Sequence, residues 1–268
     1  MNSSPKPLAL VTGASAGIGV ELARELARHG HDLVLTARRT APMEALANEL
    51  RQAGAAVTVI AADLSRPGAA AALASDLAGR GLGIEVLINN AGLGAAGRFD
   101  RIDPVRVGEM LQVNIVALTE LTRLLLPDMV ARGSGRIMLV ASVAGFSPGP
   151  RMAVYFASKA YVLSLGEALA YELRRTGVTV TVLCPGATET EFFAVAGSDP
   201  NRGANKVRKM MSAADVARIG YRGMMAGTAV VIAGTMNKLL ALGGRFAPHR
   251  ITIPVSDLLM GPTPPSAV

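Results

Sequence analysis

Short apolar runs recur along the whole chain. Each run holds three to six residues, most of them branched aliphatic, with little alternation between apolar and polar positions. Strands that are buried on both faces of a parallel sheet have this pattern. The sequence therefore predicts seven such strands, at residues 8–11, 33–35, 57–60, 86–88, 137–140, 178–183 and 230–232.

Apolar residues at helical spacing fill the segments between these runs. Two such stripes are Ile18, Leu22 and Leu26, and Leu111, Ile115, Leu118 and Leu121. We expect Pro127 to end the second of these helices. The alternation of strands and helices predicts an α/β fold, with a doubly wound parallel sheet and helices on both of its faces. No linker interrupts residues 8–233, so we expect a single domain over residues 1–268.

Two segments depart from this regular pattern. Residues 186–210 are rich in Gly, Pro and Asn and have the length of a lid or binding loop, so we expect them to cover the substrate. Residues 235–268 form an apolar extension beyond a core of residues 7–235. This extension could cover the pocket, join subunits or touch a membrane surface.

Composition excludes several classes of protein. Half of the residues are apolar, which excludes a disordered chain, and one cysteine excludes a disulfide framework. There is no Cys/His cluster spaced for zinc, and no run reaches the ~18 apolar residues that span a bilayer. A core without disulfides and a polar start without a secretory apolar region indicate the cytoplasm.

The charge is positive but scattered. Lys and Arg number 27 against 20 Asp and Glu, a net charge of +7, and only 4% of residues are aromatic. Nucleic-acid binding would need a basic stripe or arm and stacking rings, so we expect no nucleic-acid partner. A small polyanionic ligand is compatible with this charge.

Three glycines separate the first strand from the first helix, in the sequence Thr-Gly-Ala-Ser-Ala-Gly-Ile-Gly at residues 12–19. Gly13 permits a sharp turn, Gly17 lets a pyrophosphate approach the backbone, and Gly19 lets the helix pack against the sheet. The helix N-terminus offers unpaired N–H groups to the phosphates. The alternative is a flexible Gly-rich loop, but the position between strand and amphipathic helix favours a dinucleotide site.

The end of the second strand bears on the choice of cofactor. Ala37 stands where a carboxylate would bind the ribose 2′-hydroxyl of NAD, and Arg38 and Arg39 follow it. A guanidinium grips a 2′-phosphate by charge-assisted hydrogen bonds, so the sequence predicts NADP(H). Arg39 is the weaker candidate because it can point into solvent, and Ser15 can add a hydroxyl contact.

A phenol and an ammonium share one face of a later helix. Tyr155 and Lys159 are four residues apart, and Ser142 follows the fifth apolar run, at the strand end where open α/β sheets bind ligands. A neighbouring Lys and an oxidised nicotinamide both lower the pKa of a tyrosine, which makes it a usable acid and base. Taken alone, the Tyr–Lys spacing occurs often by chance, and a surface Tyr and Lys would be the favoured interpretation.

Together these motifs resemble the short-chain dehydrogenase/reductase family over residues 7–235, which implies a Rossmann-type fold. The further matching positions are Asp63, the Asn-Asn-Ala-Gly sequence at 89–92, Asn114, and Pro185-Gly186 followed by Thr188 and Thr190. The resemblance implies NADPH-dependent interconversion of a carbonyl and an alcohol, with Tyr155 as general acid and base. It also implies that Ser142 bonds the substrate oxygen, that Lys159 lowers the Tyr155 pKa and binds the nicotinamide ribose, and that Asn114 holds a water of a proton relay.

The resemblance implies a cofactor site drawn from the whole chain. Its expected residues are Gly13, Ser15, Gly17, Ile18, Gly19, Arg38, Arg39, Asp63, Leu64, Asn90, Ala91, Gly92, Tyr155, Lys159, Pro185, Gly186, Thr188 and Thr190. Asp63 would accept a bond from the adenine amine, and residues 185–190 would contact the nicotinamide. No metal is expected.

Two other functions stay open. A 3-oxoacyl thioester reductase uses the same constellation, and a non-catalytic NADP-sensing or scaffold protein would keep only the cofactor site. We expect a small, apolar carbonyl or alcohol substrate and a homo-oligomer, a homotetramer first and a homodimer second. The oligomer rests on the apolar surface of the helix that carries Tyr155, at Val162, Leu163, Leu165, Leu169 and Tyr171.

Overall fold

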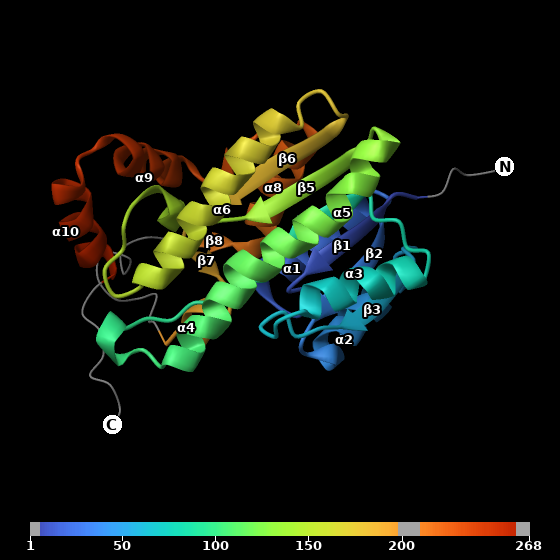
Figure 1. Ribbon diagram of the computed structural model, residues 1–268, viewed down its shortest axis with the longest axis horizontal. Helices are drawn as coiled ribbons and strands as arrows, with labels where there is room; N and C mark the ends of the chain where they lie inside the picture. Colours follow the sequence, from blue (N-terminus) through green and yellow to red (C-terminus); the bar gives the residue numbers. More distant parts are fainter. Residues whose placement is uncertain (1–5, 198–209, 261–268) are drawn as a thin grey trace.

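A parallel sheet of seven strands, in the order β3-β2-β1-β4-β5-β6-β9, forms the centre of the computed structural model, which describes residues 6–197 and 210–260 (Figure 1). The strands are β1 Leu8–Thr12, β2 Asp32–Ala37, β3 Val57–Ala61, β4 Val86–Asn89, β5 Gly135–Val140, β6 Val178–Cys184 and β9 Val230–Ile232. All seven coincide with the apolar runs, so the predicted Rossmann-type fold is confirmed.

Alternate side chains of each strand enter two apolar cores. In β1, Leu10 packs on one face of the sheet, whereas Ala9 and Val11 pack on the other. Both faces are therefore apolar, which is why the strands lack polar alternation.

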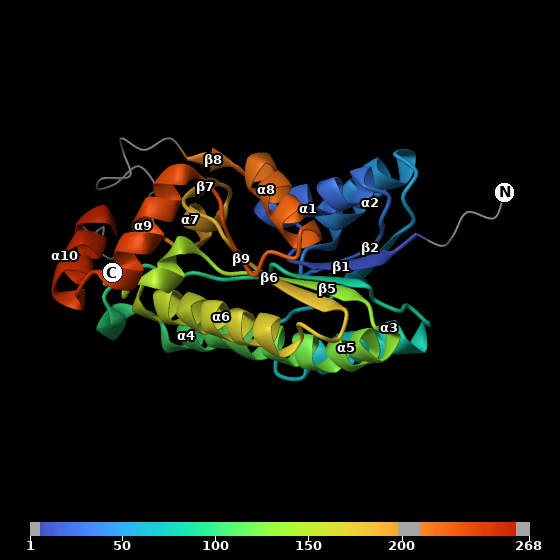
Figure 2. The same ribbon diagram turned by 90° about the horizontal axis from the view of Figure 1, so that it is seen from above.

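Helices cover both faces, as Figure 2 shows. One face carries α1 Gly17–Arg28, α2 Thr40–Gln52 and α8 Ala213–Met225, and the other carries α3 Ala69–Gly79, α4 Pro104–Leu111, α5 Leu118–Arg132 and α6 Ala153–Glu172. Leu22 and Leu26 of the predicted α1 stripe are fully buried against the sheet.

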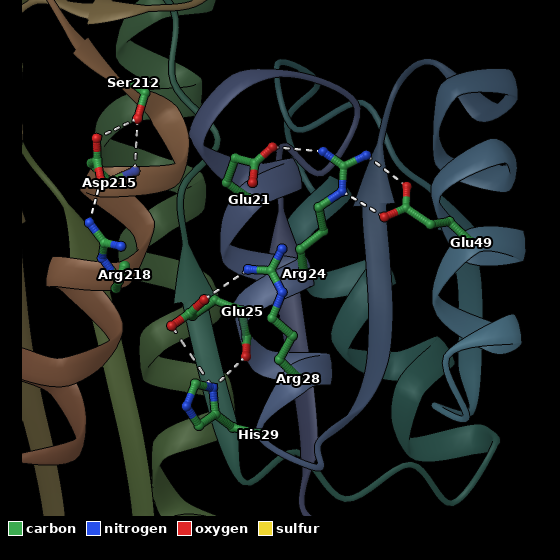
Figure 3. Close-up of polar contacts among 9 residues, drawn as sticks. All are labelled: Glu21, Arg24, Glu25, Arg28, His29, Glu49, Ser212, Asp215 and Arg218. Atoms are coloured by element: carbon green, nitrogen blue, oxygen red, sulfur yellow. Dashed lines mark hydrogen bonds and ion pairs between the residues drawn. The ribbon is translucent and has the colours of Figure 1, made fainter.

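Polar contacts on the first face join neighbouring helices (Figure 3). Arg24 of α1 lies 2.7 Å from both Glu21 and Glu49, so it joins α1 to α2. Hydrogen bonds to these carboxylates raise its pKa further above the ordinary value. The Ser212 hydroxyl accepts a bond from the Asp215 N–H and caps the start of α8.

The prediction that Pro127 ends its helix is wrong. Helix α5 continues to Arg132 and ends at Gly133, whose φ of 69° is left-handed. Pro127 and Arg123 are both exposed, so the Arg123 carbonyl that loses its helical partner faces water. The break that does occur lies before α5, where Gln112–Ala117 form a π-helical turn between α4 and α5.

The lid segment and the extension both contain regular structure. Within 186–210, the short strand β7 Thr188–Glu189 pairs with β8 Met211–Ser212 just beyond it, and α7 spans Phe192–Val195; residues 198–209 lie outside the described part. The extension forms α9 Thr235–Phe246 and α10 His249–Met260, and residues 261–268 are likewise outside it. In the portions that are described, no helix is long and apolar enough to cross a membrane.

Candidate active site

A cavity of about 760 Å³ opens at the carboxyl ends of the strands. Every residue expected at the site lines this cavity except Gly19 and Asn114, which lie behind its wall. Side chains that are more than a hundred positions apart in the chain are therefore brought together at one edge of the sheet, as the motif spacing predicts.

The glycine turn packs closely on neighbouring backbone at one end of the cavity. Gly13 and Gly17 have φ of 67° and 58°, which favour glycine. A Cβ at Gly13 would lie 2.9 Å from Ala91 Cα, and one at Gly19 would lie 2.4 Å from the Gly13 carbonyl oxygen. Ala16, at the N-cap of α1, gives no side-chain cap, so the first N–H groups of α1 stay available. This turn fits the diphosphate of a dinucleotide.

Thr12, which the motif analysis did not single out, holds the turn in place. Its hydroxyl accepts bonds of 2.9 Å from the N–H groups of both Asn90 and Ala91. In return, the Asn90 amide donates to the carbonyls of Thr12 (2.9 Å) and Gly13 (3.3 Å). The segment after β4 is thus locked to the segment after β1. The threonine just before the first glycine is the signal that could have pointed to this role.

The two arginines after β2 differ in their contacts. Arg38 is exposed and lines the cavity. Arg39, which was expected to be able to point into solvent, instead lies 2.9 Å from the Glu191 carboxylate and donates to the Ser15 carbonyl at 3.3 Å. Glu191 follows β7 in the lid segment, so this ion pair joins the cofactor end of the cavity to the lid. Sequence reasoning missed Glu191, because no motif marks it.

Asp63 follows β3 and carries its charge. Burial would raise the pKa of this carboxyl, but two hydrogen bonds from Ser65 and the charges of Arg38 and Arg66 outweigh burial and hold the pKa below its usual value. An ionised carboxylate is a hydrogen-bond acceptor only, which fits an adenine amine.

Tyr155 and Ser142 meet at the middle of the cavity. Ser142 follows β5, and its hydroxyl accepts a 3.1 Å bond from the Ala144 N–H and donates a 3.4 Å bond to the Pro185 carbonyl. Tyr155 lies in the first turn of α6. Burial raises its pKa to about 12, and a hydrogen bond with Ser142 opposes this rise. The phenol is therefore protonated at neutral pH.

Lys159 lies beside Tyr155, as their spacing on the helix predicts. Its ammonium lies 5.8 Å from the centre of the Tyr155 ring and donates a 2.8 Å bond to the Val140 carbonyl. Burial lowers the pKa of Lys159 to about 8, opposed by the nearby Cys184. The bond to β5 therefore fixes the ammonium over the Tyr155 ring.

Asn114 occupies the π-helical turn. Its Oδ1 accepts a 2.8 Å bond from the Leu93 N–H, while its Nδ2 donates 2.9 Å bonds to the Leu93 carbonyl and to the Ser158 hydroxyl. A Cβ at Gly92 would lie 3.4 Å from Lys159 Nζ and 3.6 Å from Asn114 Oδ1. Asn114 and Lys159 therefore both lie next to Gly92, which lines the cavity.

The segment after β6 closes the site from the other side. The Pro185 carbonyl accepts a 2.9 Å bond from the Val143 N–H, and the Thr188 hydroxyl donates to the Gly186 carbonyl at 3.0 Å. The Thr190 methyl would lie 2.9 Å from a Cβ at Gly17, so this segment packs on the glycine turn. Asn237 of α9 is buried against Gly186, a contact between the extension and the site that the sequence did not reveal.

The remainder of the cavity is mainly apolar, with the hydroxyls of Ser147, Thr252 and Ser256 among its lining residues. Its walls include Met152, Phe156, Phe192, Leu239, Leu240 and Val255. In the described chain, the charged residues that line the cavity are Arg38, Arg39, Asp63, Lys159 and Glu191, and all five are among or beside the expected cofactor positions. The end away from the glycine turn is thus suited to an apolar molecule.

Known proteins share both the sequence and this architecture. A ketoacyl reductase, HetN, from Nostoc sp. is 34% identical over 251 residues, covering 90% of this chain and 85% of that protein. A short-chain dehydrogenase from Sphingobium yanoikuyae, solved in complex with NADPH, has a TM-score of 0.80 at 36% identity and covers 89% of this chain and 92% of that one.

A second solved relative is the bulky-bulky ketone specific alcohol dehydrogenase from Comamonas testosteroni. Its TM-score is 0.76 at 31% identity, with 88% of this chain and 91% of that chain covered. The family model described as short chain dehydrogenase matches residues 7–201. With this match and the site geometry, the chain belongs to the short-chain dehydrogenase/reductase family of NAD(P)-dependent oxidoreductases.

Proposed function

We propose that this protein uses NADPH to reduce an apolar ketone or aldehyde to an alcohol, and catalyses the reverse oxidation. The observation that carries this proposal is the position of Tyr155 and Ser142, whose hydroxyls meet between the glycine turn and the apolar end of one cavity. A carbonyl oxygen placed there would lie between an acid and a hydrogen-bond donor.

Each residue of the group then has a separate task. NADPH supplies the hydride when bound. Tyr155 donates a proton to the carbonyl oxygen, and its raised pKa keeps it in the protonated form that reduction requires. The Ser142 hydroxyl donates to the same oxygen and stabilises the negative charge that develops on it. Lys159 binds the ribose, and Asn114, which borders the same glycine, positions a water for proton return to Tyr155.

NADPH is the proposed cofactor, in preference to NADH. No carboxylate stands at the end of β2, and both Arg38 and Arg39 line the cavity there. Arg39 is paired with the Glu191 carboxylate at 2.9 Å, which would compete with a phosphate, so Arg38 is the main candidate for the 2′-phosphate contact. The NADPH complex of the Sphingobium yanoikuyae relative supports this choice.

The test is NADPH oxidation with a panel of ketones, aldehydes, acyl thioesters, sugars and steroids. The loss of reduced-nicotinamide absorbance measures the rate. We expect turnover on bulky apolar ketones. Tyr155→Phe should lower turnover by about 10²–10⁴-fold while NADPH still binds, because only the acid–base step is removed. Tyr161→Phe, in the same helix and bonded to Thr119, is the matched control. Near wild-type turnover in Tyr155→Phe would refute the assignment.

A 3-oxoacyl thioester reductase is the second candidate. The similarity to the Nostoc ketoacyl reductase over 90% of this chain favours it. Higher kcat/KM on thioesters than on simple ketones would establish it. A non-catalytic NADP-sensing or scaffold protein would instead bind NADPH tightly and turn over nothing on the panel.

The same proposal includes a homo-oligomer in the cytoplasm. A homotetramer is the first choice and a homodimer the second. The apolar surface expected on α6 is largely absent, because Val162 and Leu163 are buried in the core and Leu165 and Leu169 pack against it, while Tyr171 is exposed. Other large apolar side chains stay exposed, at Leu111 of α4, Val116 of the π-helical turn, and Leu124 and Val130 of α5. The lone cysteine, Cys184, is a buried free thiol, which suits a reducing compartment.

A further inference from the structure

Exposed apolar side chains are concentrated on the last two helices. They are Met236, Leu239, Leu242 and Phe246 on α9, and Ile251, Ile253, Val255 and Leu258 on α10. On α9 all four are three or four residues apart, so they form one stripe, and Phe246 is 74% exposed. Figures 1 and 2 show α9 and α10 next to each other at one end of the molecule, beyond the edge of the sheet.

The opposite faces of both helices are held firmly against the site. On α9, Asn237 is buried beside Gly186, and a Cβ at Gly244 would lie 2.8 Å from the Phe146 carbonyl oxygen. On α10, the Asp257 carboxylate lies 3.1 Å from Arg151 in the loop before α6. The two helices are therefore fixed on the protein by one side, and their apolar side is left uncovered.

This apolar surface includes the mouth of the cavity. Leu239, Ile251 and Val255 line the cavity and are also exposed. A molecule that covers the surface therefore also covers the entrance. A protein partner seated there would obstruct the entrance, whereas a lipid layer would itself present apolar molecules to it.

The charges beside the stripe favour a lipid layer over a second protein. Lys238 and Arg245 lie at one edge of the α9 stripe, and Arg250 is near the start of α10. Arg245 pairs with Glu167 of α6 at 3.3 Å, so Lys238 and Arg250 carry the charge that can face a partner. Asp257, the one acidic residue of the two helices, is paired with Arg151. A second copy of the chain, docked face to face, would bring these two sets of cations together, whereas an anionic surface would neutralise them.

We propose that α9 and α10 dock on an anionic lipid surface and open the cavity mouth toward the acyl chains. The stripe lies in the interfacial layer, Lys238 and Arg250 contact lipid phosphates, and neither helix crosses the bilayer. An apolar substrate then enters from the lipid rather than from water. The last point rests on the proposed function, whereas docking itself does not.

The experiment is flotation of the full chain with vesicles of phosphatidylcholine alone and of phosphatidylcholine mixed with phosphatidylglycerol. We expect flotation with the anionic vesicles, weakened by salt. The double variant Leu242→Glu/Phe246→Glu changes two exposed residues that do not line the cavity, and it should reduce partitioning at least about tenfold. Its NADPH affinity and melting temperature should stay at the wild-type values.

A charge variant tests the electrostatic contribution to binding, and a variant away from α9 and α10 is its control. Lys238→Gln should weaken binding to anionic vesicles by roughly fivefold and leave binding to neutral vesicles unchanged, because each basic residue near the surface adds about that factor. Met225→Glu is the matched control. Met225 is 39% exposed at the end of α8, and the neighbouring Gly227 lies beside Thr179 at the start of β6, at the edge of the sheet away from the cavity, so flotation should not change.

The outcomes separate the alternatives. No flotation with either vesicle, or flotation that the double variant leaves intact, overturns the proposal. If the wild type does not float and light scattering shows that the double variant dissociates an oligomer, a second copy covers the surface and the proposal is also overturned. A protein that floats but reduces no ketone supports docking and refutes the proposed function alone.

Discussion

At the residue scale, Arg38 is the side chain that we expect to determine the preference for NADPH over NADH. It follows the Ala37 that ends β2, lines the cavity, and its charge lowers the Asp63 pKa. A charge-assisted contact with a 2′-phosphate contributes about 1.5–3 kcal/mol, which corresponds to roughly ten- to a hundredfold in affinity. We expect Arg38→Ala to weaken NADPH binding by that factor and to leave NADH binding nearly unchanged.

Fluorescence titration of both cofactors measures this preference. The loss should shrink at high salt, because Arg38 is exposed. Arg66→Ala is the control, since Arg66 also lies near Asp63, at 3.6 Å, but does not line the cavity. Equal affinity of the wild type for NADH and NADPH would contradict the choice of cofactor.

Lys159 makes the stability of the protein depend on pH. Burial lowers its pKa from 10.5 to about 8, so the folded protein loses this proton before the unfolded chain does. Between these two values the unfolded chain binds more protons, and the free energy of unfolding rises with pH. From about pH 7.5 to about pH 9 this group adds about 1 kcal/mol.

Lys159→Met should lack this rise. Urea unfolding of the wild type and the variant at both pH values measures it, with Lys238→Met as the exposed control. The same pH dependence in wild type and Lys159→Met would show that Lys159 titrates normally. The charge is retained at a cost in stability, which is expected of a residue kept for its chemistry.

At the scale of single elements, an ion pair joins α10, which forms a wall of the cavity, to the loop before α6. Arg151 has a φ of 65°, a backbone conformation that is uncommon outside glycine, and its guanidinium lies 3.1 Å from Asp257. Thr252, Val255 and Ser256 of the same helix line the cavity. The pair therefore sets the distance between α10 and the loop that precedes Tyr155.

Asp257→Asn should loosen this wall with little loss of global stability, about 0.2–1 kcal/mol, because the pair is partly exposed. We expect faster hydrogen exchange in α10, a severalfold higher KM for the ketone and an unchanged Kd for NADPH. Asp100→Asn, which breaks an exposed pair with Arg98 outside the cavity lining, is the control. Unchanged exchange in α10 would mean that other contacts hold the helix.

At the scale of the whole molecule, the exposed apolar residues of α4 and α5 are candidates for a contact between subunits. Leu111 is 40% and Leu124 is 45% exposed. Exposed apolar side chains can belong to an interface, and a charge at these positions tests whether they do. Light scattering at micromolar concentration should show a tetramer, or a dimer as second choice.

Leu111→Glu/Leu124→Glu should reduce the mass of this assembly without changing NADPH affinity, because neither residue lines the cavity. Leu242→Glu/Phe246→Glu, on the other exposed surface, should leave the mass unchanged. A stable wild-type monomer would refute the expected homo-oligomer.

Much of the fold was predictable from the sequence, because its causes are local. Each buried strand needs apolar residues on both faces, so the seven runs could be assigned without knowing what packs on them. The glycines, Ser142, Tyr155 and Lys159 were predictable for a related reason: their spacing relative to strand ends places them at one edge of the sheet. Pro127 was misjudged because its effect depends on which side of α5 faces water.

The tertiary structure alone decided the contacts between distant segments. Glu191 meets Arg39, and Asp257 meets Arg151, across 152 and 106 positions of sequence, and no local pattern marks these pairs. Burial also acts on the electrostatics, since it raises the Tyr155 pKa and lowers the Lys159 pKa, and neither effect follows from the local spacing of these two residues. For the extension, the sequence determined only that it is apolar. Which side of α9 packs on the site and which side stays uncovered depends on the neighbours that the fold brings to it.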